Sequence, residues 1–300
     1  MSSFLTRKRP RLFPYLSLSL LVCWATQAAP LWAHGELRDR IMLATREIEQ
    51  HPNDAQLYFK RGELYGFHED WDLAAADLER ARNLDPQLHL VEFARGKLMH
   101  RAGRSQSARE ILDAYIAEHP DVVQARLVRA QVLVELDDTL AAVEDYSFAL
   151  ARVSDPQPEN YLERAKALAH SGEDYLDRAI ASLDEGIARL GPLITLQLYA
   201  IELELSKKNY QGALNRLDQI TEKAQRKEKW LAQRGDILRQ AGELDQARAA
   251  YAESLSHIAR LPKSRRGTPA VSQLEESLQQ EIMELASTQD RHQPNERRKK

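Results

Sequence analysis

The sequence has little of what catalytic or covalent chemistry requires. Among its 300 residues there is one cysteine, Cys23, in an apolar stretch near the N-terminus, so a disulfide framework is excluded. If that stretch is removed, a cysteine nucleophile is excluded as well. There is no phosphate-cradling glycine loop and no nucleophile elbow. The nine histidines are scattered, with no two of them three or four residues apart on one helix. We therefore expect no enzyme, no metal site and no cofactor.

The charge balance argues against nucleic acid as a partner. The whole chain carries a formal charge of −3. Residues 1–33 contain four basic side chains (Arg7, Lys8, Arg9 and Arg11) and no acidic one, so the rest of the chain carries −7. A mildly acidic chain repels phosphate backbones, and we expect no nucleic-acid binding.

Residues 1–33 have the order of features found in an export signal. A basic segment ends at Arg11, an apolar run extends from about Tyr15 to Ala25, and small residues follow. This order is typical of a secretory signal peptide, and we expect cleavage between Ala33 and His34. The alternative is an uncleaved membrane anchor, although polar residues interrupt the run and a spanning helix needs about 20 mostly apolar residues. We therefore predict an exported protein, periplasmic or secreted, that meets a membrane only through an uncleaved signal.

What the sequence does have is a repeat with a period of 34 residues. The pairs Arg61-Gly62, Arg95-Gly96 and Arg129-Ala130 recur at this spacing, and so do the prolines at positions 52, 86 and 120. A fixed period of this length indicates stacked supersecondary units rather than one globular core. Alanine- and leucine-rich segments between the prolines predict helix pairs over 55–67 with 71–84, 89–102 with 105–118, and 123–136 with 139–152.

These residues resemble the tetratricopeptide repeat family, whose units are antiparallel helix pairs. The resemblance implies an all-α, tetratricopeptide-like α-solenoid with small residues where the paired helices cross. A fourth unit, about 158–190, has a lengthened turn at 171–174, and a fifth, about 193–222, matches least well. Ile194, Leu196 and Leu198 alternate there as in a strand, but we expect helix because a lone strand has no partner in a helical stack. The sixth unit, from Trp230 to Leu255, is clear again.

The ends of the array are predicted to differ from its middle. Residues 34–54 form the helix of an N-terminal half-repeat, and 55–262 hold about six helix pairs. Residues 263–286 form a basic turn and a capping helix, and 287–300 a disordered tail. The apolar stripe of the capping helix is expected to pack near Leu244, Tyr251 and Leu255; it consists of Val271, Leu274, Leu278, Ile282 and Leu285.

The resemblance also implies a binding site, because in this family the first helix of each pair lines a concave groove. The outward-facing positions of the first three units form the predicted partner-binding groove: Phe59, Lys60, Glu63, Phe67, Leu90, Phe93, Lys97, His100, Arg101, Leu127, Val128 and Gln131. Exposed apolar side chains usually mark binding, although the N-terminal helix or neighbouring units could cover these. We predict a non-catalytic scaffold or assembly adaptor for a protein or peptide partner. The alternatives are an enzyme or metal-handling protein with an unrecognised site, or a structural spacer.

Overall fold

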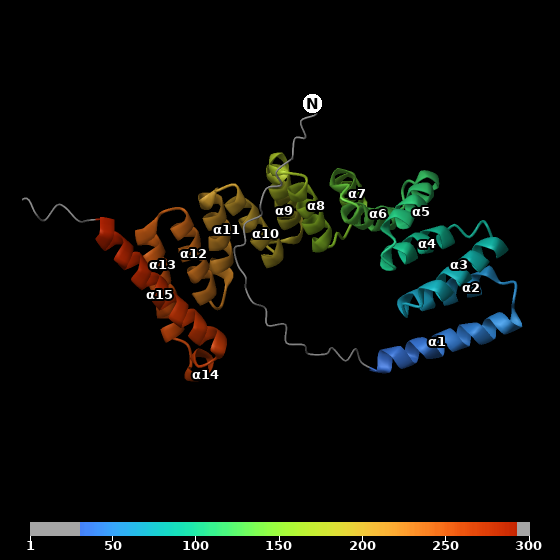
Figure 1. The fold of residues 1–300 in the computed structure, drawn as a ribbon, viewed down its shortest axis with the longest axis horizontal. Helices are drawn as coiled ribbons and strands as arrows, with labels where there is room; N and C mark the ends of the chain where they lie inside the picture. The colour runs from blue at the N-terminus through green and yellow to red at the C-terminus, as the bar shows by residue number, and fades with distance from the viewer. Residues whose placement is uncertain (1–30, 293–300) are drawn as a thin grey trace, which may run out of the picture. The chain divides into compact units, whose positions relative to one another are not determined.

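In a computed structural model, which describes residues 31–292 and the side chains of 35–287, the chain is helical throughout, with no strand among the described residues (Figure 1). The chain divides into two compact units, one ending at Asp85 and one starting at Pro86. Within residues 31–292, no helix combines the length and the apolar character needed to cross a bilayer. The predicted signal peptide lies outside the described residues, apart from 31–33.

The first unit contains three helices, α1 (Leu31–Gln50), α2 (Ala55–Phe67) and α3 (Trp71–Leu84). The bounds of α2 and α3 agree with those predicted. Asp54 caps α2 as expected, since its carboxylate accepts a hydrogen bond of 2.9 Å from the Gln56 backbone N–H. Helix α1 starts before residue 34, so the expected cleavage point after Ala33 falls within its first turn.

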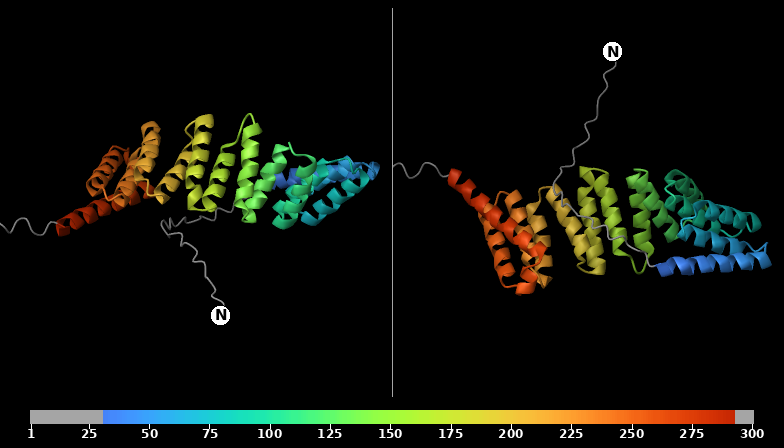
Figure 2. Two further views of the ribbon diagram at one scale, coloured as in Figure 1. Left: turned by 90° about the horizontal axis from the view of Figure 1, so that it is seen from above. Right: turned by 60° about the horizontal axis from the view of Figure 1, so that its bottom comes forward.

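The second unit contains five further helix pairs and a C-terminal helix, and Figure 2 shows the pairs side by side. The first three pairs are α4 (Leu90–Arg101) with α5 (Ser105–Glu118), α6 (Val123–Glu135) with α7 (Thr139–Arg152), and α8 (Pro158–His170) with α9 (Leu176–Leu190). The last two are α10 (Ile194–Ser206) with α11 (Tyr210–Lys223), and α12 (Glu228–Gln240) with α13 (Leu244–Ala259). The prediction of antiparallel helix pairs is confirmed, including helix rather than strand at 194–206. The lengthened turn of the fourth unit forms a short 3-10 helix, η1 (Glu173–Tyr175).

Small residues lie where paired helices cross, as the repeat pattern predicted. A β-carbon added at Gly96 would lie 2.7 Å from Leu112 Cδ2, and one at Gly235 would lie 2.2 Å from a ring carbon of Tyr251. Both neighbours are fully buried, so they have little room to yield. Glycine at these positions lets the helices approach each other closely.

The turns inside the helix pairs share one left-handed residue. Positions 69, 103 and 137, spaced by the repeat period, are occupied by Glu69, Gly103 and Asp137 with φ of 65°, 69° and 64°. After each of them a backbone N–H reaches back to a carbonyl of the preceding helix, as Asp70 does to Tyr65 at 3.0 Å. Glycine adopts this backbone without strain, whereas a side chain makes it costly.

Buried ion pairs tie helices together in both units. In the first, Arg61 donates to Asp77 at 2.6 and 2.7 Å and to the Thr45 hydroxyl at 3.1 Å, which links α1, α2 and α3. In the second, Arg129 donates to Asp145 at 2.7 and 2.8 Å. These hydrogen bonds raise the pKa of both guanidinium groups above that of a free arginine.

The C-terminal helix α15 (Pro269–His292) follows a one-turn helix, α14 (Lys263–Arg266), and lies against α13 (Figure 1). Val271, Leu278 and Leu285 are buried in one cluster with Tyr251, and Leu244 and Leu255 pack at its edge. This is the packing that we predicted for the capping helix. The helix continues for six residues into the segment expected to be a disordered tail, so that expectation is wrong for 287–292; residues 293–300 lie outside the described part.

Candidate partner-binding surface

The predicted site residues of the first unit lie on α2, beside α1. Lys60 is exposed, and its Nζ lies 3.5 Å from the Glu47 carboxylate of α1. Phe59 and Glu63 are half-buried. Phe67, the last residue of α2, is 60% exposed. Helix α1 therefore reaches this face at Lys60, whereas Phe67 is largely exposed.

On α4, the predicted residues divide into a packed pair and an exposed set. Phe93 stacks on the Tyr115 ring at 5.6 Å between centroids, and the Lys97 ammonium lies 5.1 Å from the Phe93 ring. Phe93 also packs against two buried clusters of the second unit. Leu90 is 54% exposed, and Arg101 is exposed as well. Much of the Phe93 side chain is thus packed against the core, and Leu90 is the exposed apolar side chain of this helix.

Helix α6 continues the same surface, because it lies next to α4. The His100 ring and the Glu135 carboxylate meet at 2.9 Å, and the Ser105 hydroxyl donates to the other Glu135 oxygen at 2.5 Å. Of the predicted residues, Leu127 and Val128 are half-buried against core clusters and Gln131 is exposed.

One exposed apolar residue of α6 was missed. Val134 is 36% exposed and lies one helical turn after Gln131, so helical spacing from Gln131 could have indicated it. The surface formed by α4 and α6 is therefore mixed: apolar at Leu90 and Val134, basic at Arg101 and polar at Gln131.

A small pocket lies between α10 and α11. It has a volume of about 150 Å³ and is lined by Pro192, Ile194, Gln197, Gln219, Ile220, Lys223 and Ala224. Gln197 is 2% exposed; its amide nitrogen donates to Gln219 at 3.1 Å, while its oxygen has no partner among the described residues. None of the pocket's residues was among the predicted site residues.

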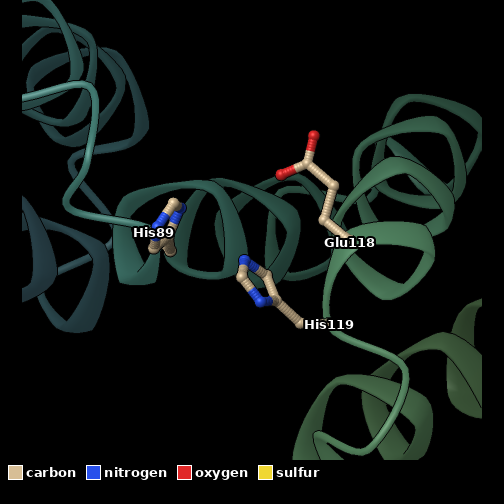
Figure 3. A group of neighbouring side chains, drawn as sticks. All are labelled: His89, Glu118 and His119. Atoms are coloured by element: carbon tan, nitrogen blue, oxygen red, sulfur yellow. The ribbon is translucent and has the colours of Figure 1, made fainter.

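One group of side chains could ligate a metal, although we expected no metal site. His89 precedes α4, and Glu118 and His119 lie at the end of α5 (Figure 3). One potential ligand atom from each lies within 4.8 Å of the others. The two histidines are thirty positions apart and on no common helix, so histidine spacing within one helix could not reveal them.

Comparison with protein families gives matches over most of the described chain. A model described as "Tetratricopeptide repeat" matches residues 59–123 and 93–160. A second, "Tetratricopeptide repeat-like domain", matches residues 162–269. No curated protein matches the sequence.

Solved structures show the same fold at low sequence identity. A tetratricopeptide repeat protein from Parabacteroides merdae is 14% identical, with a TM-score of 0.51 over 83% of this chain and 94% of its own. YrrB, described as a TPR protein with an unusual peptide-binding site, is 19% identical, with a TM-score of 0.50 over 58% of this chain and 89% of its own. A MamA double mutant is 14% identical, with a TM-score of 0.50 over 56% of this chain and 93% of its own.

Proposed function

Because this chain belongs to the tetratricopeptide repeat family, we propose that it is a non-catalytic scaffold that binds a protein or peptide through the first helices of its repeats. The observation that carries this proposal is the mixed surface of α4 and α6. Leu90 and Val134 expose apolar area there beside the exposed Arg101 and Gln131. Exposed apolar side chains with polar neighbours are typical of surfaces that bind proteins.

Two further features support a binding role. Family members are generally scaffolds rather than catalysts, and YrrB, which shares the fold, is described as having a peptide-binding site. The ion pair between Arg129 and Asp145 joins α6 to α7, and the close crossing at Gly96 packs α4 on α5, so a partner would meet a preformed surface with little ordering cost.

The test is a double variant on this surface, Leu90→Ser with Arg101→Glu. We expect the affinity for a partner captured from the protein's own extract to fall at least about tenfold, which corresponds to about 1.4 kcal/mol. The melting temperature should stay close to that of the unchanged protein, because both side chains are exposed. Titration calorimetry and thermal denaturation measure the two quantities.

Leu140→Ser is the matched control. Leu140 is 43% exposed but lies on α7, the second helix of its pair, so this change should leave affinity unaltered. Equal losses in the control and the double variant, or no loss in either, would argue against the surface. Phe93→Ala is a poor probe here, since its stacking on Tyr115 would mix lost stability with lost binding.

We also propose that the scaffold acts after export, in a periplasm or outside the cell. The support is the basic, apolar and small-residue order of residues 1–33. Amino-terminal sequencing of the exported protein should find His34 first. Recovery of Met1 or Ser2 on that protein would indicate a retained anchor instead, and absence of the protein from every exported fraction would rule out export.

A further inference from the structure

Three side chains that form no hydrogen bond or ion pair with the described residues meet at the open end of the α4–α5 hairpin. His89, at the N-cap of α4, faces His119, at the C-cap of α5, with the Glu118 carboxylate close by (Figure 3). The two imidazole rings lie edge to face with centroids 4.8 Å apart. A ligand atom from each of the three residues lies within 4.8 Å of the other two. Two imidazoles and a carboxylate are a donor set that divalent transition metals bind.

The ligand atoms of this group are available for a metal. Three of the other histidines of the described chain are bonded to acids, at 2.9 Å in each case: His68 to Asp70, His100 to Glu135, and His170 to Asp137. Within the described residues, neither imidazole of the His89–His119 pair has a hydrogen bond or an ion pair, and neither does the Glu118 carboxylate. No protein partner has to be displaced when an ion binds.

Part of the group is already held in place. The His119 ring packs on the Tyr115 ring at 4.7 Å, and Tyr115 stacks in turn on Phe93. The His119 backbone is fixed as well, since its N–H donates to the Tyr115 carbonyl at 2.9 Å. His89 and Glu118 are exposed, so their side chains can rotate. A metal ion bound by all three residues would have bonds of about 2.0–2.2 Å to each ligand atom. The His89 and Glu118 side chains must therefore move toward His119 by on the order of 1 Å.

The local charge also suits a divalent cation. Glu118 supplies one negative charge, and the C-terminal end of α5 adds the negative pole of the helix dipole. The N-terminal end of α4 carries the positive pole of its own dipole, which repels a cation. The negative charge of the Glu118 carboxylate offsets this repulsion. Mg²⁺ and Ca²⁺ prefer oxygen ligands, so the two imidazoles select against them.

We propose that His89, Glu118 and His119 form a surface site for a divalent transition metal ion of the zinc and copper class. The ion links the start of α4 to the end of α5 and thereby closes the open end of this hairpin. Three protein ligands leave at least one coordination position of a tetrahedral ion for water or for a partner's side chain.

Zn²⁺ binding to the full chain tests the proposal, measured by calorimetry and by competition with a coloured chelator. The unchanged protein should bind one equivalent whose affinity falls at least about tenfold in His89→Ala and in His119→Ala, since even outer-shell changes at metal sites cost about 10–100-fold. Zn²⁺ should raise the melting temperature of the unchanged protein and not that of His89→Ala. Ca²⁺ should give no such shift.

His170→Ala is the control, because His170 is also exposed and pairs with a carboxylate at 2.9 Å. This variant should still bind the one equivalent of Zn²⁺ whose affinity is lowered in His89→Ala. His89→Ala removes an exposed side chain, so its fold should be intact by circular dichroism, which keeps the comparison valid if His119→Ala proves unstable. The proposal is overturned if the unchanged protein binds no Zn²⁺, if His89→Ala binds it as the unchanged protein does, or if His170→Ala loses as much.

Discussion

Truncation after Leu261 should give a protein that melts at a lower temperature than the full chain and associates in solution. The truncation removes α14 and α15, and with them the buried side chains of Val271, Leu278 and Leu285. Burying a side chain of this size contributes about 1.5–3 kcal/mol. Part of this gain is offset by the entropy of ordering the helix, but the sum still makes this the largest effect that we expect.

The reason lies in what α15 covers. Tyr251 and Ile258 of α13 are fully buried and Ala250 is 4% exposed, and all three belong to the cluster that α15 completes. Helix pairs in a solenoid contact only their neighbours, so the last pair needs a cap with a polar outer face. Without α15, an apolar strip of α13 would meet water, and strips of this kind cause self-association.

Truncation after Ser287 is the matched control, since it shortens the same helix and keeps Leu285 and the rest of the stripe. Thermal denaturation and light scattering of the two truncated proteins should separate them clearly. If the protein ending at Leu261 is monodisperse and has the same melting temperature as the full chain, α15 is not a cap. The apolar stripe of α15 would then be the candidate partner-binding surface.

The helix pairs were predictable because the signals for them are local. Helix α2 follows the cap residue Asp54, and the prolines at positions 86 and 120 follow the ends of α3 and α5, so the bounds of these helices could be read from the sequence. The small residue at Gly96 identified a close crossing, and the structure places Leu112 against it. The stripe of α15 likewise indicated which face would be buried.

The side-chain contacts of the site were less predictable because they join different helices. An apolar pattern tells which face of a helix is buried, but not which side chains of neighbouring helices come within a few ångströms of each other. Phe93 was expected in the groove and stacks on Tyr115, and His89 meets His119 from another helix. Both outcomes depend on the angle at which α4 and α5 cross.

One recurring kind of polar contact, an ion pair between the two helices of a repeat, did leave a signal in the sequence. Arg61 pairs with Asp77 and Arg129 with Asp145, each sixteen positions later. The intervening repeat has Ile111 at the corresponding position, so Arg95 pairs within its own helix, with Glu92 at 2.7 Å. An arginine before the small residue of the first helix therefore forms a buried pair only where the second helix supplies an acid.

Asp145→Ala should lower the free energy of unfolding of the second unit by about 3 kcal/mol, the lower end of the 3–5 kcal/mol found when one partner of a buried ion pair is removed. Asp145 is 1% exposed, and its carboxylate accepts hydrogen bonds from Arg129 and, at 3.1 Å, from Arg126. The change would leave two partly buried guanidinium groups without this counter-charge. Arg129 keeps a bond of 2.8 Å to Asp113, which is why we place the loss at the lower end.

Asp113→Ala is the control, because it removes a carboxylate from the same arginine at an exposed position. Its side chain is 47% exposed, and exposed pairs contribute about 0–1 kcal/mol. Chemical denaturation of both variants measures the difference, and Arg129→Met added to Asp145→Ala should recover part of the loss, since it removes one of the uncompensated charges. If Asp145→Ala loses no more stability than Asp113→Ala and both losses stay within about 1 kcal/mol, the ion pair between α6 and α7 does not hold these helices together, and the α4–α6 surface must be kept in place by apolar packing alone.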